Sequence, residues 1–238
     1  MTPPNGRGGS TAVSRHRAPS LKELAAAEIR QRIFSGALRP GSKVDQDAIA
    51  ADLGMSKLPI REALITLDSE GLVRNIPRRG AFVAPLTRDD IRDHYHIFGT
   101  VVGIAAERAA EHLDDDELQR LQELADAMEA STSPAEQEEL NHEFHRAINL
   151  AGRSRRLTSV LSLLGKALPS GFYEFHTEWS QTANADHREI LDALKGRDAG
   201  EAGRAMSRHL QRSAEHAVRF LEQTGFWDDG DGDRPGRG

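Results

Sequence analysis

Residues 56–83 read SKLPIREALITLDSEGLVRNIPRRGAFV, and this stretch decides the fold of the N-terminal third of the chain. Four apolar residues in it recur at i, i+3, i+4 and i+7, which predicts a helix with one apolar stripe: Ile60, Ala63, Leu64 and Leu67. Ser56 is a suitable N-cap, and Pro59 falls in the first turn, where backbone N–H groups have no helical partner. Gly71 is suited to the residue that ends the helix.

The opposite face of this predicted helix is cationic. Lys57 and Arg61 are four residues apart and lie away from the apolar stripe, so both project from the outer face. Two short apolar segments follow and flank the turn Pro77-Arg78-Arg79-Gly80, which predicts a hairpin with two more cations at its tip. An Arg-bearing helix beside a cationic hairpin is typical of proteins that insert a helix into a DNA groove.

Charge is unevenly distributed along the 238 residues. Residues 1–85 hold 13 Lys and Arg against 8 Asp and Glu, a balance of +5, whereas residues 86–238 hold 18 against 29, a balance of −11. Charges are screened over roughly 8–10 Å at physiological salt, so a distant acidic half does not prevent DNA binding. The asymmetry predicts a basic DNA-contacting part joined to an acidic ligand or partner module.

Composition restricts the remaining classes. The chain has no cysteine, which excludes disulfides and thiolate metal sites. It has no apolar run long enough to span a bilayer and no signal-peptide pattern, so we expect a soluble, cytoplasmic protein that does not contact membranes.

Apolar periodicity predicts a mainly α-helical chain. Two helices precede the DNA-contacting helix: one around residues 21–33 and one at about 46–53, so that three helices and a hairpin form a winged helix-turn-helix. Six helices follow, at about residues 89–112, 114–130, 134–151, 156–168, 180–195 and 199–223, and predict an all-α antiparallel bundle. Asp114 and Glu117 form a predicted capping box. The predicted domains are 1–19 and 226–238 as disordered tails, 20–85 as the winged helix, and 86–225 as the helical domain.

Three segments resemble, in order and spacing, the DNA-binding domain of GntR-type bacterial transcription regulators: IRQRIFSGALRPG, AIAADLGMSKLPIREALITLDSEGLV and RRGAFV. The helical half resembles the FCD ligand-binding domain of the FadR subgroup, through LNHEFHRAI at 140–148, DHREILDAL at 186–194 and MSRHL at 206–210. The resemblance covers about residues 21–222. It implies a homodimer that binds a palindromic double-stranded DNA operator and responds to a small-molecule effector, with release from DNA as the usual outcome.

The resemblance also implies roles for particular cations. Arg61 corresponds to the base-contacting Arg of the family, and an Arg can bind guanine O6 and N7 with two hydrogen bonds. Lys57 stands where Arg is commoner; because Lys is a point charge rather than a fork, we assign it to phosphate. Arg79 and Gly80 match the wing tip, where a small residue lets the backbone approach the minor groove. The further phosphate candidates are Arg30, Arg32 and Ser56.

Three histidines match positions that hold a divalent metal in many FCD domains: His145, His187 and His209. Imidazoles from three helices suit Zn²⁺ or Ni²⁺. The fourth family ligand is an Asp, but Asn141 occupies that position here, one helical turn before His145, so the site loses one negative charge. His142 is an alternative ligand.

The first helix of the helical half also departs from the family pattern. Phe98 and Val102 occupy positions where FCD domains often have an Arg and a Glu. This change is consistent either with a more apolar effector pocket or with simple packing of Phe98 in the core.

Two other functions compete with a ligand-responsive repressor. A three-His metal could activate water for hydrolysis, although the chain has none of the His-Glu-x-x-His, Gly-x-Ser-x-Gly or Walker motifs. The helical half could also serve only to hold together a constitutive DNA-binding dimer. Stabilisation by a metal or a metabolite would distinguish a sensor from such a dimer.

Overall fold

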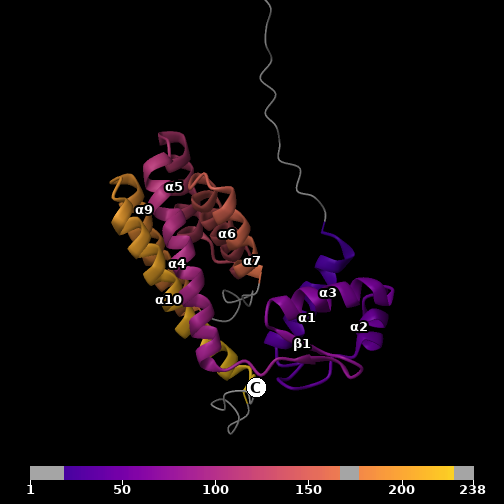
Figure 1. Ribbon diagram of the computed structural model, residues 1–238. Coiled ribbons are helices and arrows are strands. Elements are labelled where there is room, and N and C mark those ends of the chain that lie inside the picture. Colours follow the sequence, from indigo (N-terminus) through magenta and orange to yellow (C-terminus); the bar gives the residue numbers. More distant parts are fainter. Residues whose placement is uncertain (1–18, 167–176, 228–238) are drawn as a thin grey trace, which may run out of the picture.

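The computed structural model describes residues 19–166 and 177–227, and these form two groups of elements in chain order. The first group contains three helices and a hairpin: α1 (Leu21–Phe34), α2 (Gln46–Asp52), α3 (Lys57–Ser69), β1 (Val73–Ile76) and β2 (Gly80–Val83). The second group is all-helical: α4 (Arg88–His112), α5 (Asp115–Ala130), α6 (Pro134–Ala151), α7 (Arg155–Lys166), α9 (Thr177–Lys195) and α10 (Ala199–Gln223). Figure 1 shows the two groups side by side, joined by the segment that leads from β2 into α4. The predicted fold class, a winged helix-turn-helix followed by an all-α bundle, is confirmed.

The core of the first group is built by the apolar stripe of α3. Its predicted residues Ile60, Ala63, Leu64 and Leu67 are at most 2% exposed. They pack against α1, whose inner face includes Ile29 and Ile33. Gly71 has φ +78°, a left-handed conformation that favours glycine, and the N–H of Leu72 donates to the carbonyl oxygen of Leu67. The prediction that Gly71 ends this helix is confirmed.

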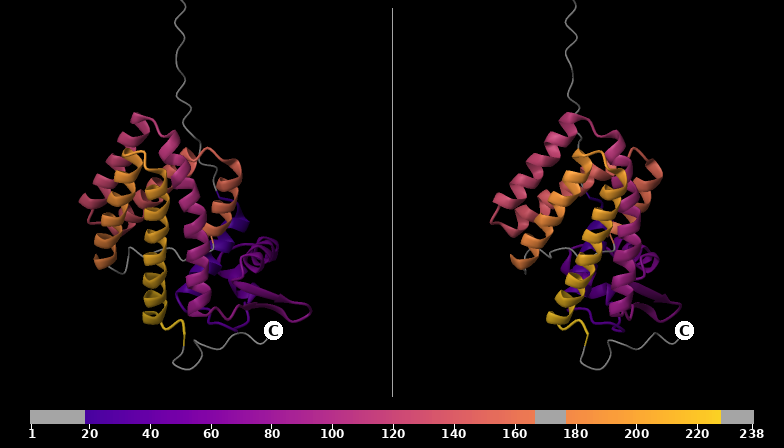
Figure 2. Two further views of the ribbon diagram at one scale, coloured as in Figure 1. Left: turned by 60° about the vertical axis from the view of Figure 1, so that its left-hand side comes forward. Right: turned by 90° about the vertical axis from the view of Figure 1, so that its left-hand side faces the viewer.

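The wing is an antiparallel hairpin with Val73 opposite Val83 and Ile76 opposite Gly80. Its loop contains Pro77, Arg78 and Arg79, and it projects from the body of the first group (Figure 2). The segment before α2 extends the sheet through a single bridge between Lys43 and Phe82. This bridge fixes the base of the hairpin next to the entry to α2.

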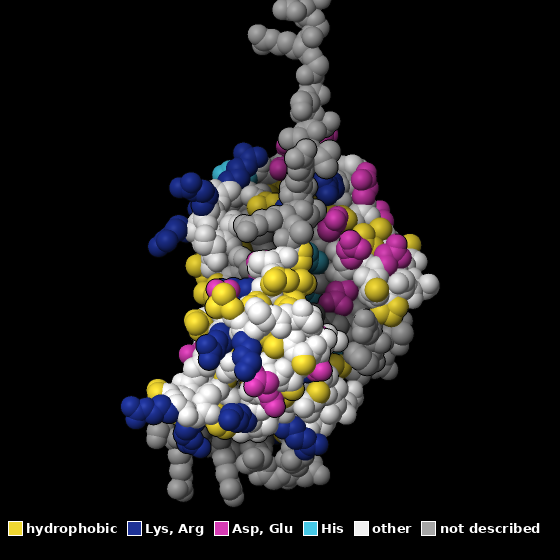
Figure 3. Space-filling model, turned by 90° about the vertical axis from the view of Figure 1, so that its right-hand side faces the viewer, with side chains coloured by type: hydrophobic (Ala, Val, Ile, Leu, Met, Phe, Trp, Pro, Cys, Tyr) yellow, Lys and Arg dark blue, Asp and Glu magenta, His cyan; other side chains and the backbone are white. Residues whose placement is uncertain are grey.

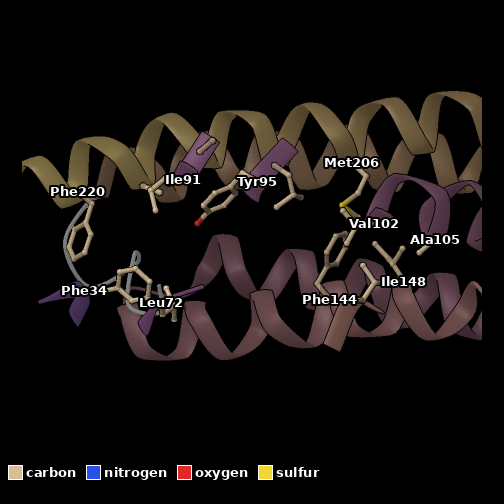
Figure 4. Close-up of a cluster of buried hydrophobic side chains, with 14 of the residues drawn as sticks. Phe34, Leu72, Ile91, Tyr95, Val102, Ala105, Phe144, Ile148, Met206 and Phe220 are labelled. Atoms are coloured by element: carbon tan, nitrogen blue, oxygen red, sulfur yellow. The ribbon is translucent and has the colours of Figure 1, made fainter. Parts of the chain in front are cut away.

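The helical group is organised around the long antiparallel pair α4 and α10, which lie side by side in both views of Figure 2. Small residues allow these helices to approach closely. A Cβ added to Gly103 would meet Ser207 Oγ at 2.5 Å and the carbonyl oxygen of Gly203 at 3.0 Å, and the hydroxyl of Ser207 donates to the carbonyl oxygen of Gly99. On the other side of α4, Phe144 and Ile148 of α6 complete a buried cluster with Val102 (Figure 4). Phe98 packs partly buried against this core.

Helix starts agree with the capping chemistry in the sequence. The predicted box at Asp114 and Glu117 is present, with the Glu117 N–H donating to Asp114 Oδ1 at 2.8 Å. Thr87 and Asp90 form a second box at the start of α4. Residues 167 and 168, the last two of the helix predicted at about 156–168, lie outside the described residues. Within the described ranges, no helix combines the length and the apolar character needed to cross a membrane.

The C-terminal end of α10 joins the two groups. Phe226 and Trp227 were predicted to belong to a disordered tail, and this is wrong: they are 2% and 8% exposed. Phe226 stacks at a tilt on Phe34 of α1, with ring centroids 6.5 Å apart, and Trp227 Nε1 donates to the carbonyl oxygen of Leu86 at 2.7 Å. The guanidinium of Arg88 lies over the Trp227 ring at 4.7 Å. Apolar burial and one hydrogen bond therefore anchor this end; the rest of the predicted tails, residues 1–18 and 228–238, lies outside the described residues.

Candidate nucleic-acid interface and candidate metal centre

The outer face of α3 carries the cations that the sequence predicts for DNA. Arg61 is exposed, and within the described part of the chain it forms no hydrogen bond or ion pair. Lys57, 61% exposed, lies 2.6 Å from a carboxylate oxygen of Asp47, which is itself 69% exposed. Such an exposed pair contributes little to stability, so the ammonium can exchange Asp47 for another anion. Ser56 stands at the N-cap, but its side chain makes no capping hydrogen bond.

The wing presents further cations beside α3. Arg78 and Arg79 are exposed at the tip, and Arg79 lies over the ring of Phe82, 5.5 Å from its centroid. Gly80 has φ +100°, and a Cβ there would lie 3.3 Å from the Lys43 side chain. Figure 3 shows Lys and Arg side chains over the lower part of this face and again at its upper left, whereas most of the Asp and Glu side chains lie over the upper right.

Two predicted phosphate contacts are held in ion pairs within the protein. Arg30 binds Glu70 through Nε and Nη2, with distances of 2.7–3.0 Å, and only 15% of the Arg30 side chain and 1% of the Glu70 side chain are exposed. Arg32 binds Glu28 and Asp52. The structure gives Arg30 a structural partner that ties α1 to the end of α3, a role that the sequence analysis missed because the partners are 40 residues apart.

Three helices bring the predicted histidines together inside the helical group. His145 of α6, His187 of α9 and His209 of α10 each offer a ring nitrogen, and these atoms lie within 4.8 Å of one another. The ring centroids are 4.8–5.2 Å apart. His187 is fully buried, His209 is 4% exposed and His145 is half-buried. His142 is exposed and lies outside this cluster.

Three buried polar atoms at this cluster have no hydrogen-bond partner in the described part of the protein. Neither ring nitrogen of His187 has a hydrogen-bond partner there, and the buried Asn141 Oδ1 has none either. Desolvation lowers the pKa of His145 and His187 well below the usual value, and neighbouring imidazoles lower it further, so both rings are neutral and keep a lone pair for a ligand. Buried polar groups normally have partners. The donor set of three imidazoles and one amide oxygen therefore fits a divalent metal ion such as Zn²⁺ or Ni²⁺.

A carboxylate behind the cluster orients one of its rings. Asp186 Oδ2 lies 3.1 Å from His209 Nδ1, and Arg212 Nε donates to the same oxygen at 2.9 Å. Burial of Asp186 opposes ionisation, but the hydrogen bonds from His209 and Arg212 outweigh it and lower its pKa. Because Nδ1 is occupied, His209 can present Nε2 to a metal. The sequence analysis missed Asp186 as a partner, although it precedes His187 directly.

A cavity lies where the two groups of elements meet. It has a volume of about 310 Å³ and is lined by α1, the end of α3, the segment that leads into α4, and the first turns of α4. Figure 4 shows Tyr95, Ile91, Phe34 and Leu72 around this junction. The two carboxylates in its lining are already engaged, Glu70 with Arg30 and Asp90 in the capping box at Thr87.

A winged helix-turn-helix followed by an all-α domain is the architecture of a class of DNA-binding transcriptional regulators. Comparison with known proteins supports this class: the model of the bacterial regulatory proteins of the gntR family matches residues 21–83, and that of the FCD domain matches residues 94–212. The chain belongs to the GntR family of regulators that carry an FCD domain, and it is a DNA-binding transcriptional regulator rather than an enzyme.

Relatives match over most of the chain. The transcriptional regulator YdhC of Bacillus subtilis is 26% identical over 202 residues, which cover 82% of this chain and 90% of that protein. The transcriptional repressor RspR of Escherichia coli K12 is 22% identical over 204 residues, covering 84% and 90%. Among solved structures, E. coli McbR/YncC has a TM-score of 0.64 and 23% identity, covering 86% of this chain and 98% of that one. A GntR-family regulator from Pseudomonas syringae pv. tomato has a TM-score of 0.51 and 23% identity, covering 85% and 86%. These two structures bear on the fold alone.

Proposed function

We propose that this regulator is a cytoplasmic homodimeric repressor that binds a palindromic operator and releases it when the helical domain binds a small carboxylate-type effector at a divalent metal. The observation that carries the DNA part is the exposed Arg61 on α3, free of any ion pair in the described chain and flanked by Lys57 and the wing. Arg61 reads a guanine in the major groove, while Lys57, Ser56 and the tip residues Arg79 and Gly80 bind the backbone or enter the minor groove. Arg32 can bind a DNA phosphate only if it releases its carboxylate partners within the protein. The same release costs more at Arg30, because it would leave the buried carboxylate of Glu70 without a partner.

The metal centre supports the sensing part of the proposal. Asn141, His145, His187 and His209 would hold the metal and are all electrically neutral as ligands, so the ion keeps its full positive charge. When bound, the metal supplies a Lewis acid that attracts anions, which favours a carboxylate effector. The family often has an Arg and a Glu on the first helix of this domain, but α4 has Phe98, packed against the core, and the buried Val102 at these positions. Because neither side chain is cationic, the metal supplies the positive charge that a carboxylate effector needs.

The end of α10 provides a physical route between the two parts. His209 lies on α10, and the same helix ends in Phe226 and Trp227, which pack on Phe34 and bond Leu86. A shift of α10 at the metal would therefore act on the joint with the winged helix.

The proposed dimer surface lies on α4. Ile97 and Ile104 are seven residues apart on this helix and are 54% and 43% exposed, and we propose that this face contacts the second copy.

The test is an operator titration with the full chain after selection of bound duplexes from a random pool. Arg61→Ala should lose discrimination between operator and random DNA, because each bidentate base contact contributes about 1–3 kcal/mol of discrimination. Lys57→Ala is the matched control: it should weaken all duplexes similarly and reduce the slope of affinity against salt by about 1. Two chains per operator are expected. Full sequence preference in Arg61→Ala would contradict the proposal.

A further inference from the structure

The face of α3 that carries Arg61 also carries two large apolar side chains. Leu58 and Ile65 are 64% and 67% exposed, the highest values among the large hydrophobic residues in the described part of the chain. Neither is needed for the core, because the opposite stripe of α3 already fills it. Single exposed apolar residues are common on protein surfaces, but here two of them share one helix face with the candidate base-reading Arg61, so that face has both an apolar and a cationic component.

Helical spacing places these side chains on either side of Arg61. Residues 58, 61, 62 and 65 follow the i, i+3, i+4, i+7 pattern and therefore share one face. Along the axis, Leu58 is about 4.5 Å before Arg61 and Ile65 about 6 Å beyond it, at 1.5 Å per residue. Base pairs are spaced by about 3.4 Å, so each apolar side chain lies about one to two base-pair steps from the guanidinium. Glu62 shares this face and can accept a hydrogen bond from a cytosine amino group.

The surrounding charge identifies the partner. Lys57 and Arg61 lie within one helical turn of Leu58, and the wing of the same domain exposes Arg78 and Arg79. Such cations favour a polyanion over an apolar protein surface. Major-groove edges of base pairs are polar except for one group, the C5-methyl of thymine. We propose that Leu58 and Ile65 are specificity-determining residues that each pack on a thymine methyl, one on either side of the guanine read by Arg61. The inference rests on the proposed function and adds a prediction about operator sequence: each half-site contains thymines, on either strand, within about two base pairs of that guanine.

Replacing thymine by deoxyuridine tests this contact, because only the methyl group is removed. The operator selected with the full chain is synthesised with deoxyuridine at each thymine in turn, and binding is measured by fluorescence anisotropy at constant salt. Burial of one methyl corresponds to about fourfold in affinity, so wild-type protein should bind about fourfold more weakly for each contacted position that is replaced. Uncontacted thymines should show no change.

Variants assign each methyl to a side chain. Leu58→Ala should bind thymine and deoxyuridine equally at one position of the half-site, and Ile65→Ala should do so at another, with unchanged slopes of affinity against salt. Leu58→Met keeps an apolar contact and should keep the thymine preference. Leu21→Ala is the matched control, since Leu21 is 57% exposed but lies on α1 rather than α3 and should keep the wild-type ratios.

The outcomes separate this inference from the function on which it rests. If an operator is selected and Arg61→Ala loses it, but Leu58→Ala and Ile65→Ala keep the wild-type ratios of thymine to deoxyuridine, this inference is wrong and the regulator remains. The inference is also wrong if these variants change the oligomeric state but not those ratios, because the apolar side chains then face protein. If no duplex is preferred at all, the proposed function itself fails and this inference fails with it.

Discussion

The winged helix and the helical domain hold the polar groups of their candidate sites in opposite ways. On α3, Arg61 is exposed and free of ion pairs within the described chain, so water solvates it at little cost to the fold. In the helical domain, the two ring nitrogens of His187 and the amide oxygen of Asn141 are buried without partners in the described chain. Each such group costs about 1–3 kcal/mol when nothing binds it. An exposed site is therefore stable without its ligand, whereas the buried site gains stability from one.

The largest expected effect tests the buried half of this contrast. For protein purified without nickel resin, Zn²⁺ at about a thousand times its Kd should add about 4 kcal/mol to the free energy of unfolding, since the metal binds the folded state. The melting temperature should rise by on the order of 10 °C in a chain of this length. His187→Ala should abolish the shift, and Asn141→Asp should strengthen binding by adding a negative ligand.

The control is His142→Ala, which removes an exposed imidazole next to Asn141 and should keep the full shift. Thermal melts with and without metal, combined with metal analysis, provide the measurement. A metal-dependent shift that persists in His187→Ala would show that the metal binds elsewhere.

The second effect concerns a cation of the winged helix that is turned inward. Arg30→Ala leaves the carboxylate of Glu70, 1% exposed, without its partner, and should cost about 3 kcal/mol in urea unfolding. Arg32→Ala, whose side chain is more exposed, should cost about 1 kcal/mol or less. The double variant Arg30→Ala/Glu70→Ala should recover part of the loss. If Arg30→Ala instead leaves stability intact and lowers the salt slope of DNA binding by about 1, the phosphate role predicted for Arg30 holds.

The third effect concerns how closely the bundle packs. Gly103→Ala places a methyl group against Ser207 Oγ and the Gly203 backbone, which cannot move without separating α4 from α10. We expect a loss of about 2 kcal/mol in unfolding free energy. Gly200→Ala is the matched control, because its nearest neighbour is the end of the flexible Arg204 side chain, and alanine favours the helix. Equal effects of the two substitutions would show that the α4–α10 contact is looser than described.

Local chemistry explains why much of this molecule was predictable from its sequence. The stripe of α3, the glycine that ends it and the capping box at Asp114 depend on residues only three or four positions apart, and all three predictions are confirmed. The histidine cluster required the family resemblance, because no rule of spacing joins residues 145, 187 and 209. Their roles as metal ligands remain predictions, as do the DNA-binding roles on α3 and the wing.

What the sequence did not predict is non-local. The Arg30–Glu70 pair joins residues 40 positions apart, and the Asp186–His209 contact joins residues 23 apart, so neither leaves a periodic pattern. Phe226 was assigned to a tail because the residues after it are rich in Gly and Asp, yet its burial is determined by Phe34, almost two hundred residues earlier. Pairing of this kind depends on the tertiary fold, which single-sequence reasoning does not supply.

The smallest effect lies at the joint between the two regions and tests whether they communicate. Trp227→Phe keeps a ring beside Phe226 and under Arg88 but removes the indole N–H that donates to Leu86, which should cost about 1 kcal/mol. If α10 carries the signal from the metal, the metal-dependent change in operator affinity should shrink in this variant and disappear in Trp227→Ala, while metal binding itself persists. Operator titrations with and without Zn²⁺ measure the change in affinity, and metal analysis of the same variants measures metal binding. An unchanged metal effect in Trp227→Ala would mean that the buried centre acts on the winged helix through another contact, or through the dimer surface on α4.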